Sequence, residues 1–139
     1  MIEMIKIYND KHKKFWGLMG PIFGSKEIRK ELPYIYHEKD KVWFLKIIND
    51  NIIGFCSALE KEKEIVIGNG FVFPDNRGMG YFKELFEFRL EYILNNFEKK
   101  PIKSILKKSL YNVYNVNGFK IIKSSTNYHW MVMENEQEN

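Results

Sequence analysis

The chain has 139 residues, a length that suits one folded domain, and it carries a formal net charge of +4. A chain of this length can bury roughly two-thirds of its unfolded surface, so its core requires neither a disulfide nor a metal. The single cysteine, Cys56, excludes an internal disulfide and predicts a reducing, cytoplasmic setting. Neither a membrane span nor a signal peptide is expected, because no apolar run reaches about eighteen residues and the first ten residues lack a signal pattern.

The first third of the chain predicts a strand and two short helices. Loose alternation over residues 1–8 predicts the strand. Asn9 or Asp10 can cap a helix that ends near residues 17–21. Ser25 can cap the second helix, and Pro33 stops it.

The middle of the chain predicts a hairpin, a longer strand and the longest helix. The β-rich runs at 42–48 and 52–59 flank the turn signal Asn-Asp-Asn and read as the hairpin. Cys56 lies in the second run, which predicts a buried strand residue. The strand over 64–73 contains Gly68 and Gly70, a pattern typical of a bulge or a close backbone approach. The helix is expected from about residue 80 to residue 97, with a broad apolar side.

The last third predicts a short strand at 102–106, a helix with Ser109 as its cap and Gly118 just beyond its end, and a second hairpin around Thr126–Asn127. The unit over 65–106 should be a right-handed crossover between parallel neighbours, and the hairpins make the remaining pairings antiparallel. We therefore expect a mixed α and β fold with a mostly antiparallel sheet. Residues 1–134 form the expected domain, and 135–139 an acidic and polar tail without order.

The stretch between the long strand and the long helix holds Arg77, Gly78 and Gly80. A helix start presents unpaired backbone N–H groups, and glycines allow a bulky anion to come near them, so a phosphate site is one interpretation. A tight turn without a ligand is the other. Lysine clusters at 11–14 and 99–108 attract phosphates or form a solvated face.

These residues resemble the GCN5-related N-acetyltransferase (GNAT) superfamily. The family's acyl-CoA pyrophosphate loop has a proline, then Arg/Gln-x-x-Gly-x-Gly/Ala, then a leucine. This sequence places there Pro74, Arg77, Gly78, Gly80 and Leu85, with Phe82 departing from the last small residue. The stretch Tyr114 to Phe119 is similar to the family's Tyr-x-x-x-Gly-Phe, and the order of elements from 43 to 133 also matches.

The resemblance implies a GNAT-like mixed sheet with a splayed parallel strand pair, flanking helices and acetyl-CoA as co-substrate. It implies a pyrophosphate bound by the backbone of Arg77, Gly78, Met79, Gly80, Tyr81 and Phe82. It also implies a pantetheine arm paired with the backbone of Phe71, Val72 and Phe73. Tyr114 falls where several family members keep a general acid, with Tyr111 as the fallback, and either tyrosine can instead only pack the helix. Phe82 adds bulk near the loop and so leaves open a weakened CoA site.

The activity implied is transfer of an acetyl group to a primary amine of unknown identity, by a monomer or a homodimer. Phe15, Trp16 and Tyr34 are expected to affect the choice of acceptor, which should enter between the N-terminal region and the closing hairpin. No general base is assigned, and scattered histidines with one cysteine predict no metal site. A DNA-base-modifying relative of the superfamily and a CoA-binding or partner-binding module without turnover remain as alternatives.

Overall fold

The computed structural model describes residues 2–135. Its helices and strands are, in chain order, β1 (Glu3–Tyr8), α1 (Phe15–Phe23), α2 (Lys26–Glu31), β2 (Val42–Ile48), β3 (Asn51–Glu60), β4 (Ile65–Val72), α3 (Tyr81–Asn96), β5 (Ile102–Lys107), α4 (Tyr111–Val116), β6 (Lys120–Ser124) and β7 (Tyr128–Met133). The expected tail lies, apart from Asn135, outside the described residues.

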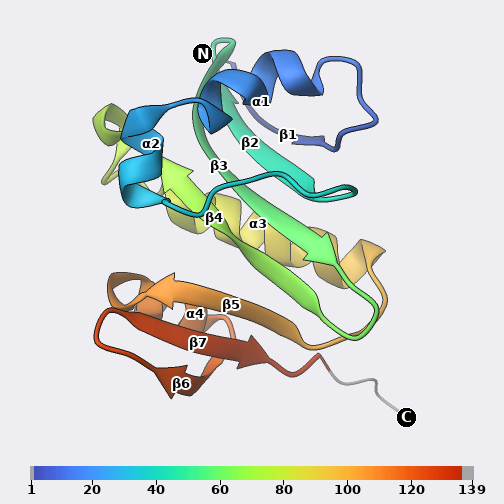
Figure 1. Cartoon of the computed structure of the whole chain (residues 1–139), viewed down its shortest axis with the longest axis vertical. Helices are drawn as coiled ribbons and strands as arrows, with labels where there is room; N and C mark the ends of the chain where they lie inside the picture. Colours follow the sequence, from blue (N-terminus) through green and yellow to red (C-terminus); the bar gives the residue numbers. More distant parts are fainter. Residues whose placement is uncertain (1, 136–139) are drawn as a thin grey trace.

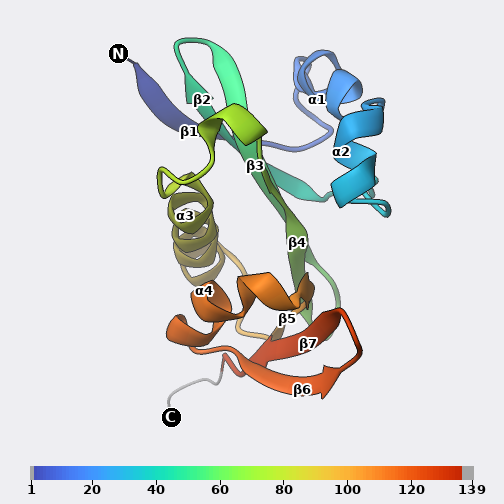
Figure 2. The ribbon, with the colours of Figure 1, turned by 90° about the vertical axis from the view of Figure 1, so that its left-hand side faces the viewer.

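The strands form one seven-stranded sheet in the order β1-β2-β3-β4-β5-β7-β6. All neighbours pair antiparallel except β4 and β5, which are parallel, as the sequence predicted. Figure 2 shows that α3 and α4 lie on one side of the sheet and α1 and α2 on the other. The mixed fold with flanking helices is therefore confirmed.

Two apolar clusters hold these layers together. The first lies between the sheet and α3 and α4, and includes Phe44, Phe86 and Tyr114. The second joins the sheet to α1 and α2 through Phe15, Trp43 and neighbouring side chains. Cys56 is buried on β3, as predicted, and burial raises the pKa of its thiol. Because the thiolate is the reactive form and a raised pKa disfavours it, we interpret Cys56 as a packing residue.

The parallel pair β4 and β5 separates soon after it forms. Pairing is confined to Ile65 with Ile102 and Val66 with Lys103, although both strands continue for several residues. In Figure 1 the two arrows diverge toward their C-terminal ends. The splayed pair that the resemblance implied is present, and the inner edges of both strands are left without a strand partner beyond this point.

Three predictions about helix ends are wrong. The helix after β1 begins at Phe15 instead of following Asn9 or Asp10, because the Asn9 side chain accepts a hydrogen bond from Lys11 N in a turn. It also continues through Pro21 to Phe23, because Phe15, Met19 and Ile22 share one buried face that outweighs the lost backbone bond. Ser109 lies inside a 3-10 turn and caps nothing, although Gly118 has the predicted positive φ beyond the end of α4.

None of the described helices is long and apolar enough to cross a membrane.

Candidate active site

The bulge predicted around Gly68 and Gly70 lies in β4, where the register with β3 shifts between Phe55 and Ser57. Its left-handed residue is Asn69, with φ of 55°. The Asn69 side chain donates to the Ser57 hydroxyl at 2.9 Å, and that hydroxyl donates to the Gly68 carbonyl at 3.2 Å. Side-chain hydrogen bonds to β3 therefore hold the bulge in place.

Arg89, which was not predicted from the sequence, reaches the same bulge from α3. Its side chain is buried, and Nη1 donates to the carbonyls of Ser57 and Gly68, both at 3.2 Å. Nε has no partner among the described residues. An arginine in the apolar stripe formed by Leu85, Phe86 and Ile93 was the available signal, since a charged side chain on a buried helix face must find polar partners.

The loop before α3 has the geometry of an anion site. Gly78 and Gly80 have φ of 81° and 84°, a region that glycine occupies without strain. Within the described part of the chain, no protein acceptor takes the N–H groups of residues 78–83, and the first helical bond is Glu84 N to the Gly80 carbonyl at 3.0 Å. Met79 and both glycines are exposed. Free, exposed donors at a helix start are what a pyrophosphate requires.

Arg77 holds this loop through contacts with β4 and α2. Its Nε donates to the Val72 carbonyl at 2.7 Å, and its Nη2 forms an ion pair with Glu31 of α2 at 2.7 Å. The guanidinium also lies over the Phe71 ring, 5.2 Å from its centroid. In this conformation the Arg77 side chain supports the loop.

Phe82 is the residue that departs from the family pattern. Its ring packs over Gly70 in the bulge. A Cβ at Gly70 would lie 2.7 Å from Cε2 of Phe82. The pair is reciprocal: the missing side chain at Gly70 makes room for the ring. The backbone donor of Phe82 is unaffected and stays available at the helix start.

Gly70→Ala is therefore expected to destabilise the protein by about 1–3 kcal/mol, the usual cost of overpacking. In a Phe82→Ala background the same substitution should cost much less, because the clashing ring is gone. Urea unfolding of the wild type, both single variants and the double variant measures this coupling. An equal cost of Gly70→Ala in both backgrounds would disprove the pairing.

The backbone of β4 next to the loop offers fewer free groups than the resemblance implied. Phe73 N donates to the Ile53 carbonyl of β3 at 3.0 Å. Strand alternation places the N–H of Phe71 on that same edge and the N–H of Val72 on the edge that β5 has left. The Val72 carbonyl already accepts from Arg77. Of the three predicted residues, Val72 thus presents its N–H to a ligand between the strands.

Tyr114 reaches β5 at the point where the parallel pairing ends. Its side chain is 3% exposed and packs edge-on against Phe86 and Phe119. Its hydroxyl shares a hydrogen bond of 2.8 Å with Ser104 Oγ, and either oxygen can be the donor. Ser104 directly follows Lys103, the last β5 residue paired with β4. The fallback, Tyr111, instead packs edge-on against His129.

An open cleft of about 460 Å³ lies between α2 and the turn that joins β6 to β7. This is the side where the sequence predicted acceptor entry. The predicted residues do not line it, however. Phe15 is fully buried in the N-terminal core, and its expected effect on the choice of acceptor stays a prediction. Trp16 and Tyr34 are exposed but lie outside this cleft.

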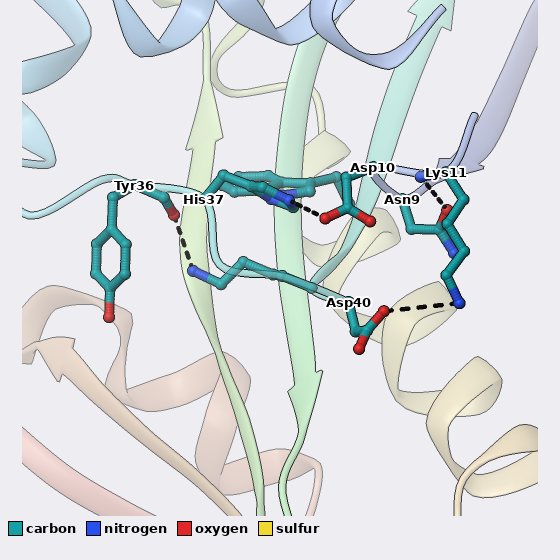
Figure 3. A network of polar contacts seen from close by, with 8 residues as sticks. Asn9, Asp10, Lys11, Tyr36, His37 and Asp40 are labelled. Carbon is teal, nitrogen blue, oxygen red and sulfur yellow. Dashed lines mark hydrogen bonds and ion pairs between the residues drawn. The ribbon is translucent and has the colours of Figure 1, made fainter. Parts of the chain in front are cut away.

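His37 is committed to a structural network and is not a free base. Trp43 Nε1 donates to His37 Nδ1 at 3.1 Å, so this nitrogen carries no proton and the proton is on Nε2. Nε2 faces Asp10 Oδ2 at 3.1 Å, and this hydrogen bond lowers the pKa of Asp10. Figure 3 shows the imidazole pointing toward Asp10, which ties the segment after β1 to the segment before β2.

Solved structures with the same architecture include an N-acyltransferase and an N-acetyltransferase. Escherichia coli ElaA aligns with a TM-score of 0.78 and 18% identity over 96% of this chain and 100% of that chain. An acyl-CoA N-acyltransferase from Pseudomonas aeruginosa aligns with a TM-score of 0.76 and 16% identity over 95% and 99%. Campylobacter jejuni N-acetyltransferase PseH, in complex with acetyl coenzyme A, aligns with a TM-score of 0.63 and 19% identity over 96% and 100%.

The sequence itself matches no protein-family model and no curated protein. The likeness to these proteins therefore lies in the three-dimensional arrangement, with its order of strands and its splayed parallel pair. This chain has the fold of the GCN5-related N-acetyltransferases.

Proposed function

We propose that the protein is an acetyl-CoA-dependent N-acetyltransferase that acts on a primary amine. The observation that carries this proposal is the position of two features beside each other: the divergence of β4 from β5, and a loop of free N–H groups directly after β4. A thioester carried on a long, phosphate-bearing arm needs both a strand edge and an anion site. The acetyl-CoA bound to PseH, a protein of the same fold, supports the assignment.

The residues present fit such a ligand. The N–H groups of Gly78 to Phe82 would hold the pyrophosphate, and Arg77 keeps the loop shaped for it through Glu31 and the Val72 carbonyl. The N–H of Val72 would donate to an amide of the pantetheine arm, as an added strand would. Arg89 holds the bulge from beneath, so the strand that carries these donors is fixed in advance.

When bound, acetyl-CoA would supply the acetyl group: the amine nitrogen would bond to the thioester carbon, the carbon–sulfur bond would break, and the proton lost by the nitrogen would pass to water, which later returns a proton to Tyr114. The sulfur then takes a proton, and Tyr114 is the donor that we assign. If Ser104 donates its own hydrogen to the phenol oxygen, the phenol hydrogen is free for the sulfur. The same hydrogen bond stabilises the phenolate that remains, since a bond to a charged acceptor is stronger than one to a neutral acceptor.

Thermal unfolding with and without acetyl-CoA tests the cofactor. At about 100–1,000 times its dissociation constant, a ligand of the native state stabilises it by roughly 2–4 kcal/mol. We expect a shift of this size, and mass spectrometry should find acetylated product with an amine acceptor. A shift without product across amine classes would favour a CoA-binding module. No shift, together with salt-sensitive DNA binding, would favour the DNA-modifying relative.

A further inference from the structure

The cleft between α2 and the β6–β7 turn carries a net positive charge. Lys30 of α2 lies on one side, and Lys107 and Lys108 at the end of β5 on the other. Among residues 2–135, none of these three ammonium groups is within ion-pair distance of a carboxylate. The one acidic side chain in the lining, Glu31, is already paired with Arg77 at 2.7 Å. The cleft therefore holds three unpaired positive charges and no free negative charge.

The floor of the cleft is held by the sheet. Lys107 stands opposite Tyr128 in the β5–β7 pair, and Lys108 N donates to the Asn127 carbonyl at 3.2 Å. Lys107 and Lys108 are consecutive and both line the cleft, so both charges attract an anion that enters it. The hydroxyls of Ser109 and Tyr128, which also line the cleft, add neutral donors.

The place and the size of the cleft fit a small acceptor. Lys107 ends the strand that carries Ser104, the partner of Tyr114. The other wall carries Glu31, which forms an ion pair with Arg77 of the loop before α3. A volume of about 460 Å³ is within the range of sites for small molecules.

We infer that the acceptor is a small amine that also carries an anionic group, a carboxylate or a phosphate. The inference rests on the proposed function, and it specifies the substrate class of that site. Lys107 and Lys108 bind the anionic group, and Lys30 adds to the field from the facing helix. A polyamine or another amine without an anion is disfavoured, because its charge has the same sign as the cleft.

The test is isothermal titration of O-phosphoethanolamine and ethanolamine, and of β-alanine and β-alaninamide, into the protein saturated with CoA, so that bound phosphate does not report the loop before α3. We expect the anionic member of at least one pair to bind about tenfold more tightly, the size expected for a few partly exposed charge pairs. Lys107→Gln combined with Lys108→Gln should remove this preference. Lys120→Gln, an exposed lysine on the edge strand β6, is the matched control and should keep it.

Equal binding within both pairs, no binding of any member, or a preference that survives the double substitution would overturn the inference. The proposed function is judged separately from this result by the acetyl-CoA shift in thermal unfolding. If CoA fails to bind, the proposed function fails, and the same titrations without CoA still measure the charge preference of the cleft. If CoA binds and the amines without an anionic group bind more tightly, only the inference about the acceptor fails.

Discussion

Tyr114→Phe should lower kcat by roughly 10²–10⁴-fold, the usual contribution of a positioned general acid. The substitution removes one oxygen and leaves the ring contacts with Phe86 and Phe119 in place. Affinity for acetyl-CoA should change little, and kcat and kcat/KM should fall together, because the lost interaction exists only in the transition state. Steady-state acetylation and an acetyl-CoA titration on the same preparation give both quantities.

Ser104→Ala is the matched control, because it removes the same 2.8 Å hydrogen bond and keeps the phenol. Tyr114→Phe leaves the buried Ser104 hydroxyl without its partner, and Ser104→Ala leaves the buried Tyr114 hydroxyl without its partner. Each variant should therefore lose about 1–3 kcal/mol of stability. If Tyr114 is the acid, Ser104→Ala retains far more activity than Tyr114→Phe. Equal losses of turnover in the two variants would mean that the hydrogen bond and the packing matter, and that the proton comes from elsewhere.

Gly80→Glu should abolish detectable stabilisation by acetyl-CoA. The residue caps α3 with φ of 84°, and a Cβ there meets no atom within 4 Å, so the new side chain fits in open space. A carboxylate at this point faces the phosphates, and such a juxtaposition of like charges costs several kcal/mol of binding free energy, or about 100-fold or more in affinity. The fold should persist with a loss of roughly 1–2 kcal/mol from the left-handed backbone.

Gly80→Gln separates charge from strain, because it has the same shape and the same positive φ. The two variants should unfold at similar temperatures without ligand. With acetyl-CoA, the glutamine variant should keep part of the wild-type shift and the glutamate variant none of it. A wild-type shift in Gly80→Glu would show that the ligand phosphates lie away from this helix start.

Local sequence signals predicted most of the fold. Asn49 and Asp50 both have positive φ, as the short hairpin turn between β2 and β3 requires, and β5 alternates buried and exposed residues. The parallel neighbours followed from the crossover through α3. The bounds of α1 could not be predicted, because the contacts that extend it past Pro21 come from the sheet and are not visible in the local sequence.

The site was predictable where it depends on backbone conformation and not where it depends on long-range contacts. Gly78 and Gly80 predict a left-handed turn at a helix start, and both have positive φ. Tyr114 was singled out because it begins the Tyr-x-x-x-Gly-Phe stretch. The ion pair of Arg77 with Glu31 joins residues 46 positions apart, and the bond of Arg89 to Ser57 joins residues 32 apart. Contacts at such separations arise only when the fold brings α2 to the loop after β4, and α3 to β3.

The proposed acetyl-CoA site runs along β4 and the start of α3. Hydrogen exchange at single-residue resolution, measured with and without saturating acetyl-CoA, tests it most directly. We predict slower exchange at the amides of Val72 and of Gly78 to Phe82. Strand alternation turns the Val72 amide toward the gap that β5 has left, and among residues 2–135 no protein acceptor takes the loop amides. The amide of Phe73, already bonded to Ile53, serves as the internal reference and should change much less. Protection that is absent from the loop amides, or that appears only at distant amides such as those of β1 or β6, would contradict the claim.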